Sequence, residues 1–149
     1  MRVLASGRAS EIVDLGDGRV LRTFKGNGEP EREATVMEHA RRHGFPVPQV
    51  IEVRDEALVL ELVDGPTMSA DLSRRPWRLA RHARTLAELH DRLHEIPYEG
   101  ERLLHLDLHP ENVLLSSHGP VVIDWTNAEA GDPALDVALT WVIVAGVGH

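Results

Sequence analysis

Residues that can move protons or hold metal ions cluster in one short segment, LLHLDLHPENVLL, at positions 103–115. They are His105, Asp107, His109 and Asn112. Histidines and an aspartate at alternate positions of a strand would point the same way and could hold zinc or iron, as in a metal-dependent hydrolase. The same letters read as H-x-D-x-x-x-x-N, the spacing of a phosphotransferase catalytic loop. Two chemistries therefore compete for this segment.

The metal alternative would use His105, Asp107 and His109 as ligands. The other histidines show no second ligand spacing, and Pro110 argues against a long regular strand here. A third interpretation is a buried loop whose histidines bond only to the backbone. We favour the phosphotransferase, and on that interpretation the alternation of His109 with Asp107 is incidental.

A phosphotransferase makes demands on positions outside the segment. Asp107 would accept or orient the proton of a hydroxyl acceptor, and Asn112 would reach Mg²⁺. A second carboxylate must stand at the end of a nearby strand, and the run VVIDW provides Asp124. A short hairpin between Asn112 and Asp124 would bring both to the same end, which suits a metal that prefers oxygen ligands.

The elements that must position these residues fall into a β-rich part and a helical part. Alternating or clustered apolar residues predict strands at 2–6, 11–15, 19–24, 49–53 and 57–63, and a hairpin from 113 to 124. Helical spacing predicts a helix at 31–43 and helical structure from 64 to about 96. We therefore predict an α+β chain. Residues 1–63 form an antiparallel five-stranded sheet with one helix, and residues 64–149 form a mostly helical lobe with a small hairpin.

Composition excludes several classes of protein. The formal net charge of −8 argues against a partner such as nucleic acid or an anionic membrane. The absence of cysteine excludes disulfides and thiol catalysis. The N-terminal residues lack the apolar core of a signal peptide, and the longest apolar run, 137–147, is too short to span a bilayer. A cytoplasmic protein is expected.

The segment 103–139 resembles the core of the aminoglycoside phosphotransferase/choline kinase-like family, a branch of the protein-kinase-like fold. Three earlier segments resemble other parts of that family in the expected order. REATVMEHARRHGFPVPQV (32–50) resembles its regulatory helix and the following strand, LVLELVDGPT (58–67) its hinge, and LAELHDRLH (86–94) the helix before its catalytic loop. The resemblance implies a two-lobe kinase-like fold. It also implies transfer of the γ-phosphate of ATP, or GTP, to a hydroxyl of a small molecule.

The resemblance also assigns roles to individual residues. It makes Asp107 the catalytic base and makes Asn112 and Asp124 the Mg²⁺ ligands. His105 and Asp136 would support the catalytic loop. Residues placed around the nucleotide are Ser6, Gly7, Val20, Arg22, Glu33, Glu61, Val63, Leu114 and Ile123. Within that set Glu33 would pair with the basic residue of the third strand, and Glu61 and Val63 would form the hinge.

Two departures from the family pattern affect these expectations. Arg22 stands where the family has a lysine; it can still pair bidentately with Glu33, but it is not an equivalent replacement. This departure leaves open a non-catalytic nucleotide-binding module, a pseudokinase. The family also continues well beyond the metal-binding aspartate. We therefore expect either a C-terminally truncated chain or a minimal form that makes a homodimer through the apolar segment 140–149.

Overall fold

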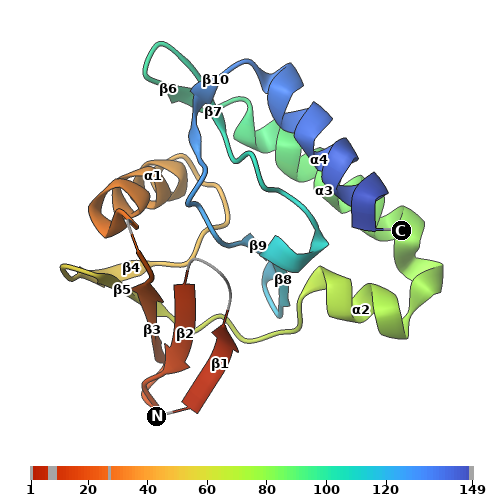
Figure 1. Ribbon diagram of the computed structural model, residues 1–149. Helices are drawn as coiled ribbons and strands as arrows, with labels where there is room; N and C mark the ends of the chain where they lie inside the picture. Colours follow the sequence, from red (N-terminus) through yellow and green to blue (C-terminus); the bar gives the residue numbers. More distant parts are fainter. Residues whose placement is uncertain (1, 7–9, 27, 148–149) are drawn as a thin grey trace.

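The computed structural model describes residues 2–6, 10–26 and 28–147, and its first half is built on one antiparallel sheet. The strands are β1 (Arg2–Ser6), β2 (Ser10–Asp14), β3 (Arg19–Phe24), β4 (Val50–Val53) and β5 (Ala57–Glu61). Their order is β1-β2-β3-β5-β4, and every neighbouring pair is antiparallel. The predicted five-stranded antiparallel sheet is confirmed, and it fills the lower left of Figure 1.

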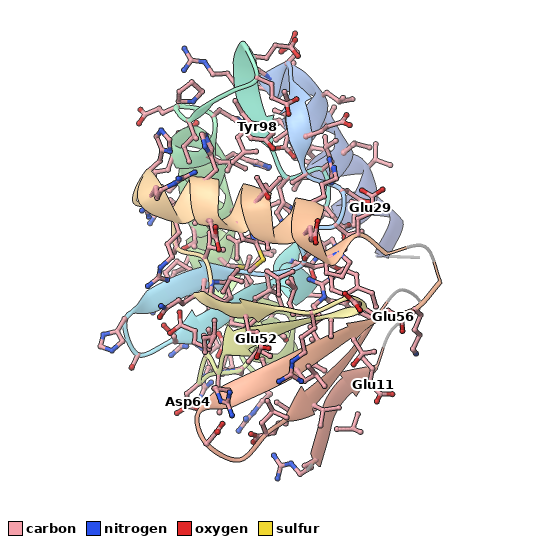
Figure 2. All side chains as sticks on the ribbon, turned by 90° about the vertical axis from the view of Figure 1, so that its left-hand side faces the viewer. Glu11, Glu29, Glu52, Glu56, Asp64 and Tyr98 are labelled. Atoms are coloured by element: carbon pink, nitrogen blue, oxygen red, sulfur yellow. The ribbon has the colours of Figure 1, made fainter. Side chains whose placement is uncertain are left out.

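One helix, α1 (Pro30–Arg42), packs on this sheet. Pro30 suits its first turn, where no backbone N–H is needed, and Gly44 follows its end with the left-handed φ of 81° that glycine tolerates. The buried stripe of α1 includes Val36, Met37 and Ala40. Figure 2 shows α1 crossing the molecule between the sheet and the helical part, with Glu29 at its beginning. The helix therefore lies at the boundary between the two parts of the chain.

The second half is mostly helical but is not one continuous helical run. It contains α2 (Met68–Arg74), the short 3₁₀ helices η1 (Pro76–Arg78) and η2 (Pro110–Asn112), α3 (Leu79–Leu93) and α4 (Pro133–Val147). The helical structure predicted from 64 to 96 begins only at Met68, where Thr67 caps α2 by accepting a hydrogen bond from Ala70 N–H. It breaks again before Pro76, because proline cannot continue a helix interior. The predicted lobe boundary at residue 63 lies between β5 and α2 and stays a prediction.

The helix α4 is apolar on nearly every side. It lies beside α3 in Figure 1. Its Thr140 contacts His90 of α3, and its Asp136 contacts His94, the residue that follows α3. Its outer face leaves Trp141 72% exposed. The homodimer expected through this face stays a prediction. No helix in the described part of the chain is both long enough and apolar enough to cross a membrane.

A three-stranded sheet was not predicted from the sequence. It consists of β6 (Pro97–Tyr98), β7 (Glu101–Leu104) and β10 (Glu129–Gly131), in the order β10-β7-β6. Strands of two to four residues are too short to show an alternating pattern, so the sequence predicts no strand in these segments. The sheet matters because β7 leads directly into residue 105 and β10 follows the loop after Asp124.

The predicted hairpin is present as β8 (Val113–Ser116) and β9 (Gly119–Val122). It is fastened to the segment after β5, since Leu115 N–H donates to Pro66 O over 2.8 Å. The two backbone segments lie so close here that a Cβ on Gly65, whose φ is 145°, would overlap the carbonyl oxygen of Leu115. Only glycine fits this position.

Candidate functional site

The turn between β7 and η2 forms the centre of the site. Asp107 lies in this turn, and its side chain is 28% exposed. Its Oδ1 lies 3.2 Å from Nε2 of His109, and its Oδ2 accepts a 3.1 Å hydrogen bond from Nδ2 of Asn112. The same Asn112 nitrogen donates to the backbone oxygen of Asp107 over 2.9 Å. These contacts fix the carboxylate while part of it stays accessible.

His105 joins this turn to the segment that carries Asp124. Its ring is fully buried, and burial lowers its pKa, which favours the neutral imidazole. In the tautomer that satisfies both contacts, Nε2–H donates to Ile123 O over 3.0 Å and Nδ1 accepts from Asp107 N–H over 3.2 Å. The ring thus bridges the backbone of Asp107 and the residue before Asp124.

This geometry gives no support to the metal alternative. Residues 105–109 do not form a strand, so the alternation of His105, Asp107 and His109 does not create the shared strand face that the metal alternative requires. Both ring nitrogens of His105 already have partners. Within the described ranges no group of three histidine or acidic side chains is placed to hold a metal ion.

Asp124 stands at the end of the β8–β9 hairpin, beside Asn112. Val113 pairs with Val122, and Ile123 N–H donates to Asn112 O over 2.9 Å, so the hairpin brings Asn112 and Asp124 to the same end. Asp124 has a φ of 59°, a left-handed conformation that non-glycine residues adopt rarely and that clusters at functional sites.

Charge favours the ionised form of Asp124. Burial opposes ionisation, but the Arg22 guanidinium and hydrogen bonds from Thr126 outweigh it and hold the pKa below its ordinary value. Nη2 of Arg22 lies 3.1 Å from Asp124 Oδ1, and the Thr126 hydroxyl donates to the same oxygen over 2.8 Å. An ionised carboxylate beside the Asn112 amide provides the hard oxygen ligands that Mg²⁺ prefers.

Arg22 and Glu33 form a buried ion pair between β3 and α1. Nη1 of Arg22 contacts Oε1 of Glu33, and the two residues are 4% and 2% exposed. The pair is not bidentate, because Nη2 of Arg22 donates to Asp124 and to the Thr126 hydroxyl, over 3.1 and 2.9 Å, instead of to Glu33. Arg22 therefore links the glutamate of α1 to the predicted metal ligand.

Glu33 also holds the backbone that follows Asp124. Trp125 N–H donates to Oε1 of Glu33 over 3.0 Å. The Trp125 side chain is fully buried, its indole N–H donates to Val122 O over 3.0 Å, and its ring meets the edge of the His105 ring. These contacts pack Trp125 behind Asp124 and fix the backbone that follows it.

The two predicted hinge residues differ in their backbone hydrogen bonds: Glu61 N–H has a partner, whereas Val63 has none among the described residues. Glu61 N–H donates to Gln49 O over 3.0 Å, and Glu61 Oε1 accepts from Gln49 N–H over 2.8 Å. The backbone groups of Val63 bond to no other residue in the described part of the chain, so they remain available to a nucleotide base. Figure 2 marks this region by Asp64, at the side of the sheet away from Glu29.

Of the other five residues predicted around the nucleotide, the structure describes the side chains of three. Val20 is buried on the same face of β3 as Arg22, and Leu114 and Ile123 are half-buried on and just after the hairpin. Ser6 ends β1, and its side chain is not described. Gly7 lies outside the described residues.

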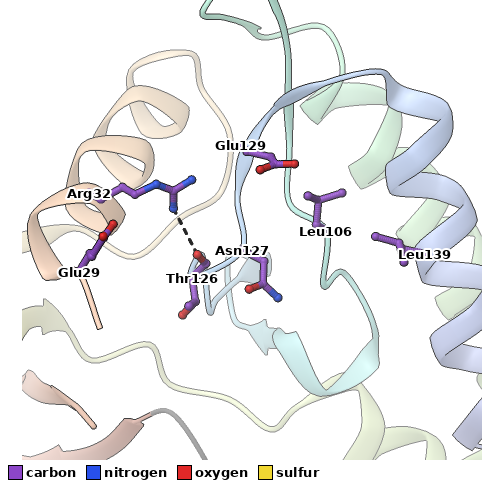
Figure 3. Close-up of a pocket in the computed structure, with 7 residues that line it drawn as sticks. All are labelled: Glu29, Arg32, Leu106, Thr126, Asn127, Glu129 and Leu139. Carbon is purple, nitrogen blue, oxygen red and sulfur yellow. Dashed lines mark hydrogen bonds between the residues drawn. The ribbon is translucent and has the colours of Figure 1, made fainter. Parts of the chain in front are cut away.

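A cavity of about 480 Å³ opens beside the turn, between the start of α1 and α4 (Figure 3). It is lined by Glu29, Arg32, Leu106, Thr126, Asn127, Glu129 and Leu139. Arg32 crosses its wall by donating to the backbone oxygen of Thr126 over 3.3 Å. A smaller neighbouring cavity of about 160 Å³ includes Glu33. The beginning of α1 is therefore tied to the segment after Asp124.

The predicted supporting residue Asp136 lies at the start of α4 and is fully buried. Its carboxylate accepts the backbone N–H groups of His105 and Leu106, over 3.0 and 2.9 Å. It therefore contacts the chain immediately before Asp107.

Two residues of the site were missed from the sequence. His109 was judged incidental, yet it contacts Asp107, and that hydrogen bond raises its pKa. Thr126 received no role, yet its hydroxyl contacts Arg22 and Asp124. His109 stands two residues after Asp107, and that proximity was a usable signal. Nothing in the spacing of Thr126 indicates its contact with Arg22, which is distant in the chain.

Comparisons with known proteins agree on a kinase-like chain. A family model described as RIO domain matches residues 27–133. Among solved structures, the chain is similar to the Rio2 kinase of Chaetomium thermophilum in a complex described as ADP/Mg²⁺-phosphoaspartate. The TM-score is 0.68 at 20% identity, over 93% of this chain and 50% of that one. The likeness confirms the predicted kinase-like fold.

Curated relatives match over a shorter stretch. The thiamine kinases of Salmonella paratyphi B and Salmonella newport are 49% identical over 39 residues, which is 26% of this chain and 14% of theirs. The chain thus matches half the length of the Rio2 kinase chain and about a seventh of the thiamine kinases. The matching family model is the RIO domain, whereas the sequence resemblance pointed to the aminoglycoside phosphotransferase branch of the same fold.

Proposed function

The chain belongs to the RIO domain family, and from that membership we propose that it is a nucleotide- and Mg²⁺-dependent phosphotransferase. We further propose that its acceptor is a hydroxyl group of a small molecule, as in the aminoglycoside phosphotransferase-like proteins that residues 103–139 resemble. One observation carries the proposal: Asp107, Asn112 and Asp124 lie in two segments joined by the His105 ring and by the Ile123–Asn112 hydrogen bond.

Each residue has a distinct part in the proposed reaction. Asp107 accepts the proton of the acceptor hydroxyl, because its carboxylate is fixed by His109 and Asn112 and is still accessible. Asn112 and Asp124 hold the metal through oxygen atoms. Mg²⁺ bound there would neutralise charge on the nucleotide phosphates. Positioning and electrostatics supply most of the catalysis in such a site.

The nucleotide, ATP or GTP, lies between the sheet and the hairpin. The backbone groups of Val63, which bond to no other described residue, would bond its base, and Val20, Leu114 and Ile123 would contact the base from the two sides. Arg22 supplies a cation on the phosphate side. The ADP and Mg²⁺ in the description of the Rio2 kinase structure support this choice of ligands.

The identity to thiamine kinases supports a small-molecule alcohol as the acceptor. The description of the Rio2 kinase structure as a phosphoaspartate complex points instead to a carboxyl group of a protein. The two are separated by incubating the protein with γ-labelled ATP and a panel of aminoglycosides, choline, amino sugars, homoserine and thiamine. We expect label on a small molecule. Label on the protein alone would contradict the proposed small-molecule acceptor but would still support phosphotransferase activity.

A pseudokinase is the second candidate, and one observation favours it. Arg22 already uses both terminal nitrogens on Glu33, Asp124 and Thr126, so its charge is partly committed before a nucleotide binds. Stabilisation by ATP and Mg²⁺ without turnover of any acceptor, or of the protein itself, would select this candidate.

Asp124→Asn is expected to remove the Mg²⁺-dependent part of nucleotide binding. The wild-type Tm should rise further with ATP and Mg²⁺ than with ATP alone, because a ligand that binds only the folded state stabilises it. The variant should show the same Tm in both conditions. Asp91→Asn, an exposed carboxylate on α3, serves as the control and should behave as the wild type. A full metal-dependent rise in the Asp124 variant would show that the metal is held elsewhere.

A further inference from the structure

The turn that carries Asp107 is held from behind by a buried carboxylate. Leu106 has a φ of 65°, and this left-handed residue turns two successive backbone N–H groups, of His105 and Leu106, toward Asp136. Such a pair of amides forms an anion-binding concavity. The Asp136 carboxylate fills it and is fully buried. The backbone conformation immediately before Asp107 therefore depends on the placement of this carboxylate.

A histidine at the end of α3 completes the hydrogen bonds of that carboxylate. Nε2 of His94 donates to Asp136 Oδ2 over 2.8 Å, the oxygen that also accepts His105 N–H. His94 follows the last residue of α3 and is itself largely buried, with 11% of its side chain exposed. The contact fixes Asp136 relative to α3 as well as to α4.

A second histidine of α3 reaches the other side of Asp107. The Thr140 hydroxyl on α4 donates to the backbone oxygen of Leu108 over 2.8 Å and lies 3.2 Å from Nε2 of His90. Burial lowers the pKa of His90, so its neutral ring can donate Nε2–H to this hydroxyl. The rings of His90 and His94 stack with centroids 5.3 Å apart. One histidine pair thus reaches the backbone on both sides of Asp107.

We propose that His90 and His94 are positioning residues for Asp107, acting through Thr140 and Asp136. This inference rests on the proposed phosphotransferase function. His94 holds the amides before Asp107 and His90 holds the carbonyl after it, so the carboxylate keeps its place relative to Asn112. Among the described residues, neither histidine hydrogen-bonds a residue predicted around the nucleotide, so their loss should slow the reaction without weakening nucleotide binding.

The test compares two replacements of His94. His94→Leu removes the donor to Asp136, and His94→Gln keeps a donor at about the same reach. We expect kcat to fall about tenfold or more in the leucine variant, because small misplacements of a reacting group cost up to about a hundredfold. The KM for nucleotide should stay within about twofold. The glutamine variant should recover most of the lost kcat.

A matched control separates positioning from ordinary stability. His82, on the same helix, donates to the buried Asp71 over 2.7 Å, and neither residue hydrogen-bonds the turn that carries Asp107. His82→Leu should lower Tm comparably to His94→Leu but leave kcat within about twofold of wild type. The control is demanding, because α2, which carries Asp71, packs against η2, which contains Asn112. A general disturbance of packing near the site would therefore also lower the kcat of the control variant. An equal loss of kcat in the two variants would overturn the proposal.

Amide exchange of the peptide spanning 103–108 gives a readout that needs no activity. The His94→Leu variant should exchange these amides faster than wild type, while His94→Gln and His82→Leu should not. If wild type turns over no nucleotide, the proposed function fails. The exchange rates still test whether His94 holds the amides of His105 and Leu106 through Asp136. Unchanged exchange in His94→Leu would overturn the positioning role whatever the activity.

Discussion

Asp107→Asn is expected to lower kcat by about 10²–10⁴-fold, the usual contribution of a general base. Asparagine keeps the shape of the side chain and can still accept hydrogen bonds, but it cannot take the proton of an acceptor hydroxyl. The amide has a single acceptor oxygen, so it keeps the contact to either His109 or Asn112 but not to both. The measurement is steady-state nucleotide turnover with the acceptor found by the labelling experiment.

Nucleotide binding should be nearly unaffected by this change. The Tm rise with ATP and Mg²⁺ should match that of wild type, because Asp107 is not a proposed metal ligand. Glu111→Gln is the control, since Glu111 lies in the same loop, is exposed and has no proposed role. Turnover by the Asp107 variant within threefold of the Glu111 variant would rule out Asp107 as the base.

Arg22→Met should lower the free energy of unfolding by about 3–5 kcal/mol, the cost of leaving a buried charge unpaired. The methionine fills much of the space, but Glu33, at 2% exposure, loses its cation. Asp124 and Thr126 lose a donor as well. Urea unfolding followed by circular dichroism measures the change.

The loss should depend on pH. Burial raises the pKa of Glu33, and Arg22 opposes that shift, so removing Arg22 raises the pKa further. A carboxyl group with a higher pKa in the folded state binds more protons there, and stability then falls as pH rises above the ordinary carboxyl pKa. The difference in unfolding free energy between wild type and Arg22→Met should therefore be smaller at pH 5 than at pH 7.

A double variant provides the matched comparison. Arg22→Met with Glu33→Gln leaves no buried charge unpaired, so it should be more stable at pH 7 than Arg22→Met alone. A single variant within about 1 kcal/mol of wild type, or a double variant less stable than the single one, would contradict the energetic role assigned to this pair.

The sequence predicted the parts of the fold whose patterns are long. The strands of the first sheet and the helix α1 carry clear periodicity, and the hairpin from Val113 to Val122 contains two runs of apolar residues. The catalytic-loop motif placed Asp107, Asn112 and Asp124 together, and the structure brings them together. Their roles stay predictions until the variants are measured.

The missed features depend on contacts or conformations that have no local sequence pattern. Leu106 and Asp124 adopt left-handed backbone, which is uncommon for residues other than glycine and which leucine in particular does not favour. The surrounding hydrogen bonds compensate for the strain. The bond from Thr126 to Arg22 spans most of the chain. The strands β6, β7 and β10 pair only because the helices and loops around them bring them into register.

The pairing of β7 with β10 has a consequence for how related sequences can vary. Leu104, next to the turn that carries Asp107, pairs with Glu129, which closes the loop after Asp124. This pairing therefore fixes the segment that enters the Asp107 turn and the segment that leaves the loop after Asp124. The base of the β8–β9 hairpin is fixed by the hydrogen bond from Ile123 N–H to Asn112 O. Residues inserted at the tip of that hairpin, between Ser116 and Gly119, leave these anchors in register. An insertion between Leu104 and Asp107 would instead displace Asp107 from the ladder that fixes it, so we expect length variation at the hairpin tip and not in this turn.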